Sequence, residues 1–143
     1  MIQPSCRVHI NWENFCHNIN ILNKKGHILM PVIKADAYGH GVLKAAAALE
    51  KLGIGWAATG TLEEAAAVRD SGFSGNVVAL LSLVPDKEHV RLAVEKRLVP
   101  LIHNREGLHA VKNVLAELSP DRPLDIAVKV DTGMARLGFF CQE

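Results

Sequence analysis

The chain of 143 residues has the size of one ordinary domain, and its 49% hydrophobic and 22% charged residues are typical of a globular protein. Its 16 basic and 15 acidic residues leave a net charge of +1, which provides no electrostatic footprint for nucleic acid or an anionic membrane. No apolar run approaches a membrane span or a secretory leader, and the three cysteines lack metal-ligand spacing, so we expect a soluble cytoplasmic protein with reduced thiols.

The predicted elements alternate between strands and helices. Polar and apolar residues alternate over 7–12, which predicts a half-buried strand, and a helix capped by Asn14 or a neighbour follows until Gly26. From there the pattern is regular, and the expected elements in chain order are a strand at 28–33, a helix at 42–52, a strand at 56–59, a helix at 62–71 with Thr61 as its N-cap, a strand at 77–81, a helix at 86–96, a strand at 98–102, a helix at 105–118 and a strand at 124–130.

Nearly continuous apolar strands separated by helices predict an α/β fold with a parallel sheet. An open doubly wound sheet and part of a (β/α)8 barrel of the TIM type both fit this pattern. A complete barrel takes about 250 residues, so residues 1–143 can hold only about the first five βα units. A barrel that stops after 124–130 exposes two sheet edges. We therefore expect a fragment, a partial N-terminal barrel domain without the rest of the barrel or a further β-rich domain.

The segment 32–41, Val-Ile-Lys-Ala-Asp-Ala-Tyr-Gly-His-Gly, carries the first functional signal. It places Lys34 at the end of an apolar strand, Tyr38 (the chain's only tyrosine) four residues later, and a helix start at Val42. Desolvation can lower the pKa of a lysine and make it nucleophilic, and the unpaired N–H groups of a helix start suit a phosphate. A cofactor with a carbonyl and a phosphate, such as pyridoxal 5′-phosphate, would use these features. The simpler interpretation is a surface lysine followed by an ordinary turn.

A second segment, Lys-Val-Asp-Thr-Gly-Met-Ala-Arg-Leu-Gly at 129–138, lies where the last predicted strand ends. Its Asp-Thr-Gly is also the catalytic triplet of aspartic proteases, in which two carboxylates share one proton. Those enzymes are all-β, whereas this chain alternates strands with helices. Met134 also stands where they usually have a small residue.

Both segments resemble the signature motifs of the alanine racemases, the second with Ala135 where glycine is common. The resemblance extends from about Arg7 to Phe139 and includes Leu-Glu-Glu-Ala at 62–65. It implies the pyridoxal 5′-phosphate-binding barrel of the alanine racemase type, and an isomerase that interconverts L- and D-alanine and so supplies D-alanine for bacterial peptidoglycan. It also implies a homodimer that acts on a small amino acid, with no metal, nucleic acid or membrane as partner.

The resemblance assigns roles to four residues. Lys34 would be the Schiff-base lysine and one of two acid/base groups, and Tyr38 would hydrogen-bond the cofactor phosphate. Arg136 would bind the substrate carboxylate. Lys129, which is carbamylated in some members, would orient Arg136 or remain a solvated lysine. A neighbouring lysine or arginine would push the pKa of Lys34 toward the working pH. His103, at another strand end, could face this site but receives no role.

The opposite-face base of this family is a tyrosine of the partner subunit's C-terminal domain, and Tyr38 already has another assignment. We therefore expect this chain alone to be inactive. Three alternatives stay open. The protein could be a racemase of broader amino-acid range, or a related pyridoxal phosphate barrel or decarboxylase, although those usually lack Ala-Tyr-Gly-His-Gly. The chain could also serve only as a folding or assembly domain.

Overall fold

The first described helix begins earlier than predicted, because its N-cap is Asn11 and not Asn14. A computed structural model describes residues 6–24 and 27–140. Helix α1 spans Trp12–Leu22, and the Asn11 side chain caps it by accepting a hydrogen bond from the Asn14 N–H at 2.9 Å. Because α1 ends at Leu22, the predicted end at Gly26 is too late, and Gly26 itself lies outside the described residues.

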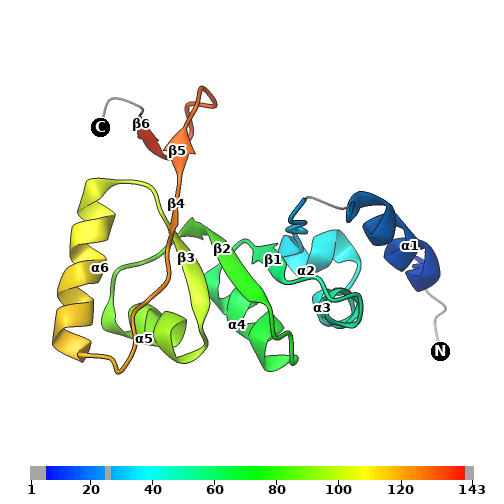
Figure 1. Cartoon of the computed structure of the whole chain (residues 1–143), viewed down its shortest axis with the longest axis horizontal. Coiled ribbons are helices and arrows are strands. Elements are labelled where there is room, and N and C mark those ends of the chain that lie inside the picture. The colour runs from blue at the N-terminus through cyan, green and yellow to red at the C-terminus, as the bar shows by residue number, and fades with distance from the viewer. Residues whose placement is uncertain (1–5, 25–26, 141–143) are drawn as a thin grey trace.

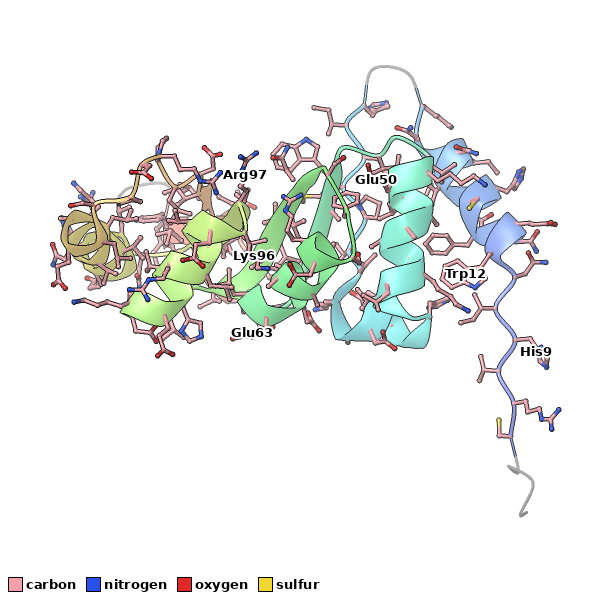
Figure 2. The ribbon with its side chains drawn as sticks, turned by 90° about the horizontal axis from the view of Figure 1, so that it is seen from below. His9, Trp12, Glu50, Glu63, Lys96 and Arg97 are labelled. Carbon is pink, nitrogen blue, oxygen red and sulfur yellow. The ribbon has the colours of Figure 1, made fainter. Side chains whose placement is uncertain are left out.

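The strand predicted over 7–12 is wrong. The chain before α1 extends away from the rest of the fold, as Figure 2 shows for His9, and Val8 is 81% exposed. An alternating pattern forms a strand only where a neighbouring strand accepts its hydrogen bonds. No strand of the described part of the chain lies beside this segment.

The strand predicted over 28–33 is reduced to a single bridge. Val32 pairs in parallel with Ala58, and hydrogen bonds join the Ile33 N–H to the Ala58 carbonyl at 2.7 Å and the Ala58 N–H to the Pro31 carbonyl at 2.8 Å. Proline has no N–H to donate, which restricts it to strand ends and edges. The chain therefore joins the sheet only at the residues that immediately precede Lys34.

Four parallel strands in sequence order form the main sheet (Figure 1). They are β1 (Trp56–Thr59), β2 (Asn76–Ser82), β3 (Leu98–Ile102) and β4 (Ala127–Val128), and each pairs in parallel with the next. A doubly wound sheet reverses its strand order at a switch point, whereas a barrel adds each strand beside the previous one. The unbroken order, which begins with the Val32 bridge, is that of a barrel.

The last predicted strand, 124–130, is divided in two. Only β4 belongs to the main sheet, while β5 (Val130–Asp131) pairs with β6 (Phe139–Phe140). Lys129 connects the two pairings, because its N–H donates to the Ile102 carbonyl at 2.9 Å and its carbonyl accepts from the Phe139 N–H at 2.8 Å. The second motif is thus a loop whose two ends meet.

The helices that follow β1, β2 and β3 each begin directly after a side-chain N-cap, of which only Thr61 was predicted as a cap. Two short elements come first, α2 (Lys34–Gly39) and α3 (Val42–Lys51). After β1, β2 and β3 come α4 (Leu62–Asp70), α5 (Lys87–Glu95) and α6 (Arg105–Leu118). Their N-caps accept a hydrogen bond from the backbone N–H three residues later, and these caps are Thr61, Asp86 and Asn104.

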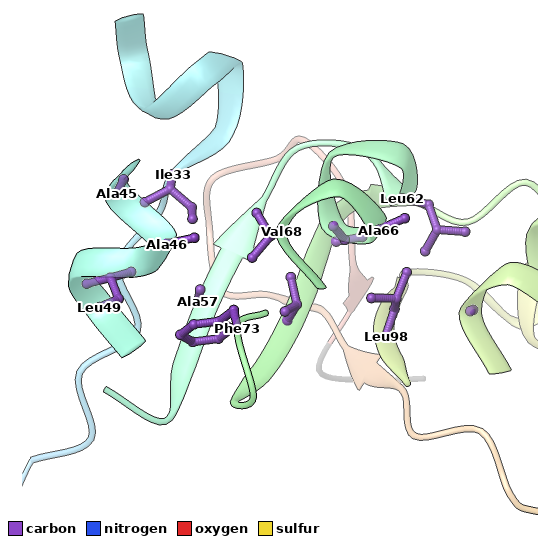
Figure 3. Packing of buried hydrophobic residues seen from close by; sticks show 14 of the residues in the cluster. Ile33, Ala45, Ala46, Leu49, Ala57, Leu62, Ala66, Val68, Phe73 and Leu98 are labelled. Carbon is purple, nitrogen blue, oxygen red and sulfur yellow. The ribbon is translucent and has the colours of Figure 1, made fainter. Parts of the chain in front are cut away.

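The strands bury two different faces. Val77 and Ala79 of β2 pack with α4 and α5 in the large core, to which Phe73 and Leu98 also belong (Figure 3). Val78, between them, lies on the opposite face in a small cluster with Ala58 and Val99. In a barrel the first face meets the ring of helices and the second turns inward. The sequence's prediction of a partial (β/α)8 barrel agrees with this packing.

Candidate active site

Lys34 lies at the carboxyl end of the chain segment that joins the sheet beside β1. Its neighbour Ile33 is only 4% exposed and packs in the large core, whereas Lys34 is half-buried. Within the described part of the chain, no hydrogen bond or ion pair occupies its amine. The carboxyl ends of parallel strands are where α/β barrels place their chemistry. Lys34 therefore lies at the end of the sheet where α/β barrels place their chemistry, with no partner for its amine among the described residues.

The residues after Lys34 form an unusual left-handed turn. Ala35, Asp36, Ala37 and Tyr38 all have φ between 50° and 54°, a region that residues other than glycine rarely enter. The helix expected from an Ala-rich segment is right-handed, so the backbone here is held against its local preference. Contacts with the rest of the protein must therefore stabilise this left-handed conformation.

Two carboxylates hold this turn at its ends. Glu64 of α4 accepts a hydrogen bond from the Ala35 N–H at 2.8 Å, and Asp36 accepts one from the Val42 N–H at 2.7 Å. The second contact corrects a prediction from the sequence. The first N–H of α3, expected to suit a phosphate, is occupied by a carboxylate of the same turn. A phosphate bound near Tyr38 would need other donors.

Tyr38 extends from the turn into solvent, with 61% of its surface exposed. The turn ends at His40, whose ring Nδ1 lies 2.8 Å from the Ala37 carbonyl and so binds its own backbone. His40 therefore has the local role that its position between two glycines indicates. Lys34 and Tyr38 stand on one short turn, which places the amine and the phenol at the same end of the sheet.

The second motif is shaped by Asp131. Its carboxylate accepts hydrogen bonds from the N–H groups of Gly133 at 3.0 Å and Ala135 at 3.1 Å. These backbone bonds, and to a lesser extent the charge of Lys129, hold the pKa of Asp131 below its usual range. Asp131 thus remains an anion that folds its own loop. This arrangement, on a chain that alternates strands and helices, does not fit the aspartic protease interpretation.

A cavity of about 300 Å³ brings Arg136 together with a residue that the sequence left without a role. Arg136, Asp131 and Gly138 line it from the second motif, and His103 and Asn104 line it from the end of β3. His103 Nδ1 is buried and has no hydrogen-bond partner among the described residues. The only sequence signal for His103 was its place at a strand end.

The predicted site residues fall into two groups on the sheet. Lys34 and Tyr38 adjoin β1, whereas Lys129 and Arg136 follow β4. The strands between them are each about 4.8 Å from the next. Only the curvature of the sheet around a barrel axis brings such positions to face one another. Within the described residues, no group of histidine, cysteine or acidic side chains could hold a metal ion.

The residues present fit pyridoxal phosphate at the lysine and leave its other contacts to be supplied elsewhere. Lys34 has an unpaired amine, and the adjacent backbone is open, because a Cβ added at Gly39 or Gly41 would meet nothing within 4 Å. Tyr38 presents an exposed hydroxyl beside this space. The backbone at these two glycines is therefore uncovered on the side where a side chain would project.

The chain is similar to known proteins along nearly its whole length. A family model described as the N-terminal domain of alanine racemase matches residues 10–143. The alanine racemase of Nitratidesulfovibrio vulgaris strain Hildenborough is 44% identical over 110 residues, which cover 77% of this chain and 28% of that protein. The alanine racemase of Lawsonia intracellularis is 35% identical over 139 residues, covering 97% of this chain and 36% of that protein.

Solved racemase structures are similar to this chain in fold. The alanine racemase of Clostridium difficile 630 superposes with a TM-score of 0.77 at 26% identity, covering 89% of this chain and 33% of that one. A histidine racemase of Leuconostoc mesenteroides has a TM-score of 0.77 at 27% identity, covering 87% and 33%. This chain thus spans about a third of the length of the relatives it matches.

Proposed function

The chain belongs to the alanine racemase family, and on that premise we propose that it carries the cofactor lysine of a pyridoxal 5′-phosphate-dependent racemase. The observation that carries the proposal is the position of the two motifs. Both stand at the carboxyl ends of strands in one parallel sheet, with the free amine of Lys34 on the first and the guanidinium of Arg136 on the second.

Lys34 has two tasks in this proposal. It would hold the cofactor, and its amine would accept the Cα proton, or donate one, on one face of the substrate. The bound cofactor supplies an electron sink that makes this Cα–H bond acidic. Because Ile33 is buried in the core and the following turn is fixed at both ends, the backbone of Lys34 is held rigidly. Such rigidity keeps a base aligned with the bond that it must break.

Arg136 orients the substrate. A guanidinium offers a planar pair of donors that matches a carboxylate, and the cavity beside Arg136 gives an amino acid room to approach it. Lys129, half-buried next to Asp131, supports this loop either as a cation or, when carbamylated, as an anion that orients Arg136. Tyr38 contributes its hydroxyl to the cofactor phosphate.

The second acid/base group comes from outside this chain. Racemisation needs one group on each face of the Cα, and the chain's only tyrosine already has a role. We propose that a second copy of the whole protein supplies this group in a homodimer. The product would be D-alanine for peptidoglycan, made in the cytoplasm.

A broader substrate range is the second candidate. The histidine racemase that shares this fold shows that relatives with similar backbones act on an amino acid other than alanine. Racemisation rates of the whole protein with alanine, serine and histidine distinguish the two candidates. A rate with histidine that equals or exceeds the rate with alanine would favour the broader enzyme.

The attachment of the cofactor is tested by chemical trapping. The protein is loaded with pyridoxal phosphate, reduced with borohydride and mapped by peptide mass spectrometry. We expect the pyridoxyl group on Lys34 and its loss in Lys34→Ala. Lys44, which is exposed on α3, and the half-buried Lys129 serve as internal controls. A label on either of them in place of Lys34 would contradict the assignment, and no label at all would favour a folding or assembly role.

A further inference from the structure

Glu64 makes more contacts than a helix cap requires. Its Oε2 accepts hydrogen bonds from the N–H groups of Gly60 at 2.7 Å and Thr61 at 3.3 Å, both at the end of β1. Its Oε1 accepts the Ala35 N–H at 2.8 Å, although Ala35 lies 29 residues earlier in the chain. One carboxylate therefore ties the residue after Lys34 to the strand beside it.

Only part of this arrangement serves α4. In a capping box, the N-cap hydroxyl accepts from the third helical N–H while the side chain of that residue accepts from the N-cap N–H. Thr61 and Glu64 form both of these bonds. The bonds to Ala35 and Gly60 lie outside the box. Oε1 thus bonds the turn of residues 34–39, which we call the lysine turn.

The lysine turn needs such a restraint. Four consecutive residues other than glycine are left-handed, and each disfavours that conformation. The Glu64 bond lies at the first of them, directly after Lys34. Gly60 adds a steric condition, because a Cβ there would lie 3.0 Å from Glu64 Oε2 and 3.5 Å from the Lys34 Cβ. The carboxylate, the glycine and the lysine side chain therefore pack against one another.

We propose that Glu64 is the positioning residue of Lys34: its carboxylate joins the left-handed lysine turn to the end of β1 and so fixes where the amine stands. This inference rests on the proposed function for the role of the Lys34 amine. The bond from the Ala35 N–H to the Glu64 carboxylate is a feature of this chain's own structure. Glutamine cannot replace the carboxylate, because one of its two side-chain groups donates hydrogen bonds and would face an N–H.

The test compares Glu64→Gln with Thr61→Ala in the whole protein. Thr61→Ala removes the 3.2 Å bond from the Glu64 N–H to Thr61 Oγ1, and so weakens the same cap without touching the carboxylate. We expect hydrogen exchange of the Ala35 amide to rise about tenfold or more in Glu64→Gln, since the bond to a charged acceptor is either lost or replaced by a weaker bond to a neutral amide oxygen, and to stay near wild type in Thr61→Ala. The yield of borohydride-trapped Lys34 at limiting cofactor should fall only in Glu64→Gln.

Each other outcome has a meaning. If Glu64→Gln and Thr61→Ala change Ala35 exchange and Lys34 trapping equally, Glu64 is only a helix cap and the inference is wrong. If wild type shows no trapped Lys34, the proposed function fails. Ala35 exchange still tests whether Glu64 holds the lysine turn. If Glu64→Gln does not fold, Glu64→Asp replaces it, because a side chain shorter by one methylene withdraws the carboxylate from the Ala35 N–H while keeping its charge. Unchanged Ala35 exchange in that variant would overturn the inference.

Discussion

Arg136 is the residue whose role depends most on its loop. The loop closes on itself, since Val130 pairs in parallel with Phe139 and a Cβ added at Gly138 would lie 2.6 Å from the Asp131 nitrogen. Gly138 also has a φ of 134°, so a residue with a side chain would be strained there as well as crowded. The loop thus holds Arg136 over the cavity next to His103.

Replacing Arg136 by lysine keeps the charge and removes the planar fork. In the whole protein we expect the cofactor to stay bound to Lys34 while kcat/KM for both alanine enantiomers falls, by about 2–5 kcal/mol if a desolvated pair with the substrate carboxylate is broken. If Arg136 were instead solvated at the rim of the cavity, the same substitution would lower kcat/KM by less than about 1 kcal/mol. Cofactor occupancy, followed by visible absorbance, is the control, and an unchanged kcat/KM would remove Arg136 from the site.

At the scale of elements, side chains at both ends of α5 tie it to α4. At the amino end, His89 lies 2.8 Å from Asp86 through Nδ1 and 3.2 Å from Glu63 of α4 through Nε2 (Glu63 is labelled in Figure 2). At the carboxyl end, Arg69 of α4 donates to the carbonyls of Lys96 at 2.9 Å and Arg97 at 3.0 Å. The two helices that cover β2 and β3 are thus joined at both ends.

The tie at His89 depends on pH. The Asp86 side chain raises the pKa of His89 above its ordinary 6.5. The pKa of Asp86 is lowered from 3.8 by the His89 backbone N–H, and that of Glu63 is lowered from 4.5, first by the Thr61 side chain. The histidine's contribution to stability is complete below pH 6.5 and is lost as the pH rises through its raised pKa. The two carboxylates contribute fully to stability at pH values above their ordinary pKa values. They lose that contribution as the pH falls through their lowered pKa values.

We therefore expect His89→Ala to reduce the free energy of unfolding most between about pH 4.5 and 6.5, and progressively less as the pH rises through the raised pKa of His89. The effect should be small, because the side chains of His89, Glu63 and Asp86 are 30%, 65% and 49% exposed. Urea unfolding of wild type and variant at pH 5.5 and 8.5 measures it. Equal losses at both pH values would mean that His89 acts by packing and not by charge.

At the scale of the whole molecule, the sheet order decides how the sites can meet. The Val32 bridge and strands β1 to β4 follow one another without a reversal, so their carboxyl ends lie along one edge of the sheet. Lys34 stands at the start of this edge and Arg136 at its end. In a closed barrel the face around Ala58, Val78 and Val99 would turn inward, and the curvature of the sheet would bring the two ends of this edge toward one another. No described helix is long and apolar enough to cross a membrane.

This arrangement predicts a partial reaction for the 143-residue chain by itself. With Lys34 as the base on one face and no second group opposite, we expect slow exchange of the Cα hydrogen of one alanine enantiomer in deuterated water. Racemisation should be at least about 100-fold slower than in a whole racemase, because a positioned acid/base group contributes that much or more. Proton NMR follows the exchange and chiral chromatography the conversion. Turnover equal to that of a whole racemase would contradict the prediction.

The sequence alone determined the features that depend on near neighbours. Helices α4, α5 and α6 begin within one residue of their predicted starts, and α4 has its predicted cap Thr61, because a cap side chain bonds an N–H only three residues away. Strands β1 and β3 have the predicted bounds, because their apolar runs are buried on both faces. The two motifs were visible because each is a continuous run of residues, and the family to which the chain belongs followed from them.

Only the tertiary structure decided the features that depend on distant partners. Residues 7–12 and 28–30 carry strand patterns but lack a neighbouring strand among the described residues, and a pattern without a partner forms no ladder. The left-handed turn after Lys34 contradicts local preference and rests on contacts such as the one from Glu64, 29 residues away. His103 and Arg136 meet because β3 lies next to β4. A local pattern records which conformations a segment favours, whereas these contacts exist only once the sheet has brought distant segments together.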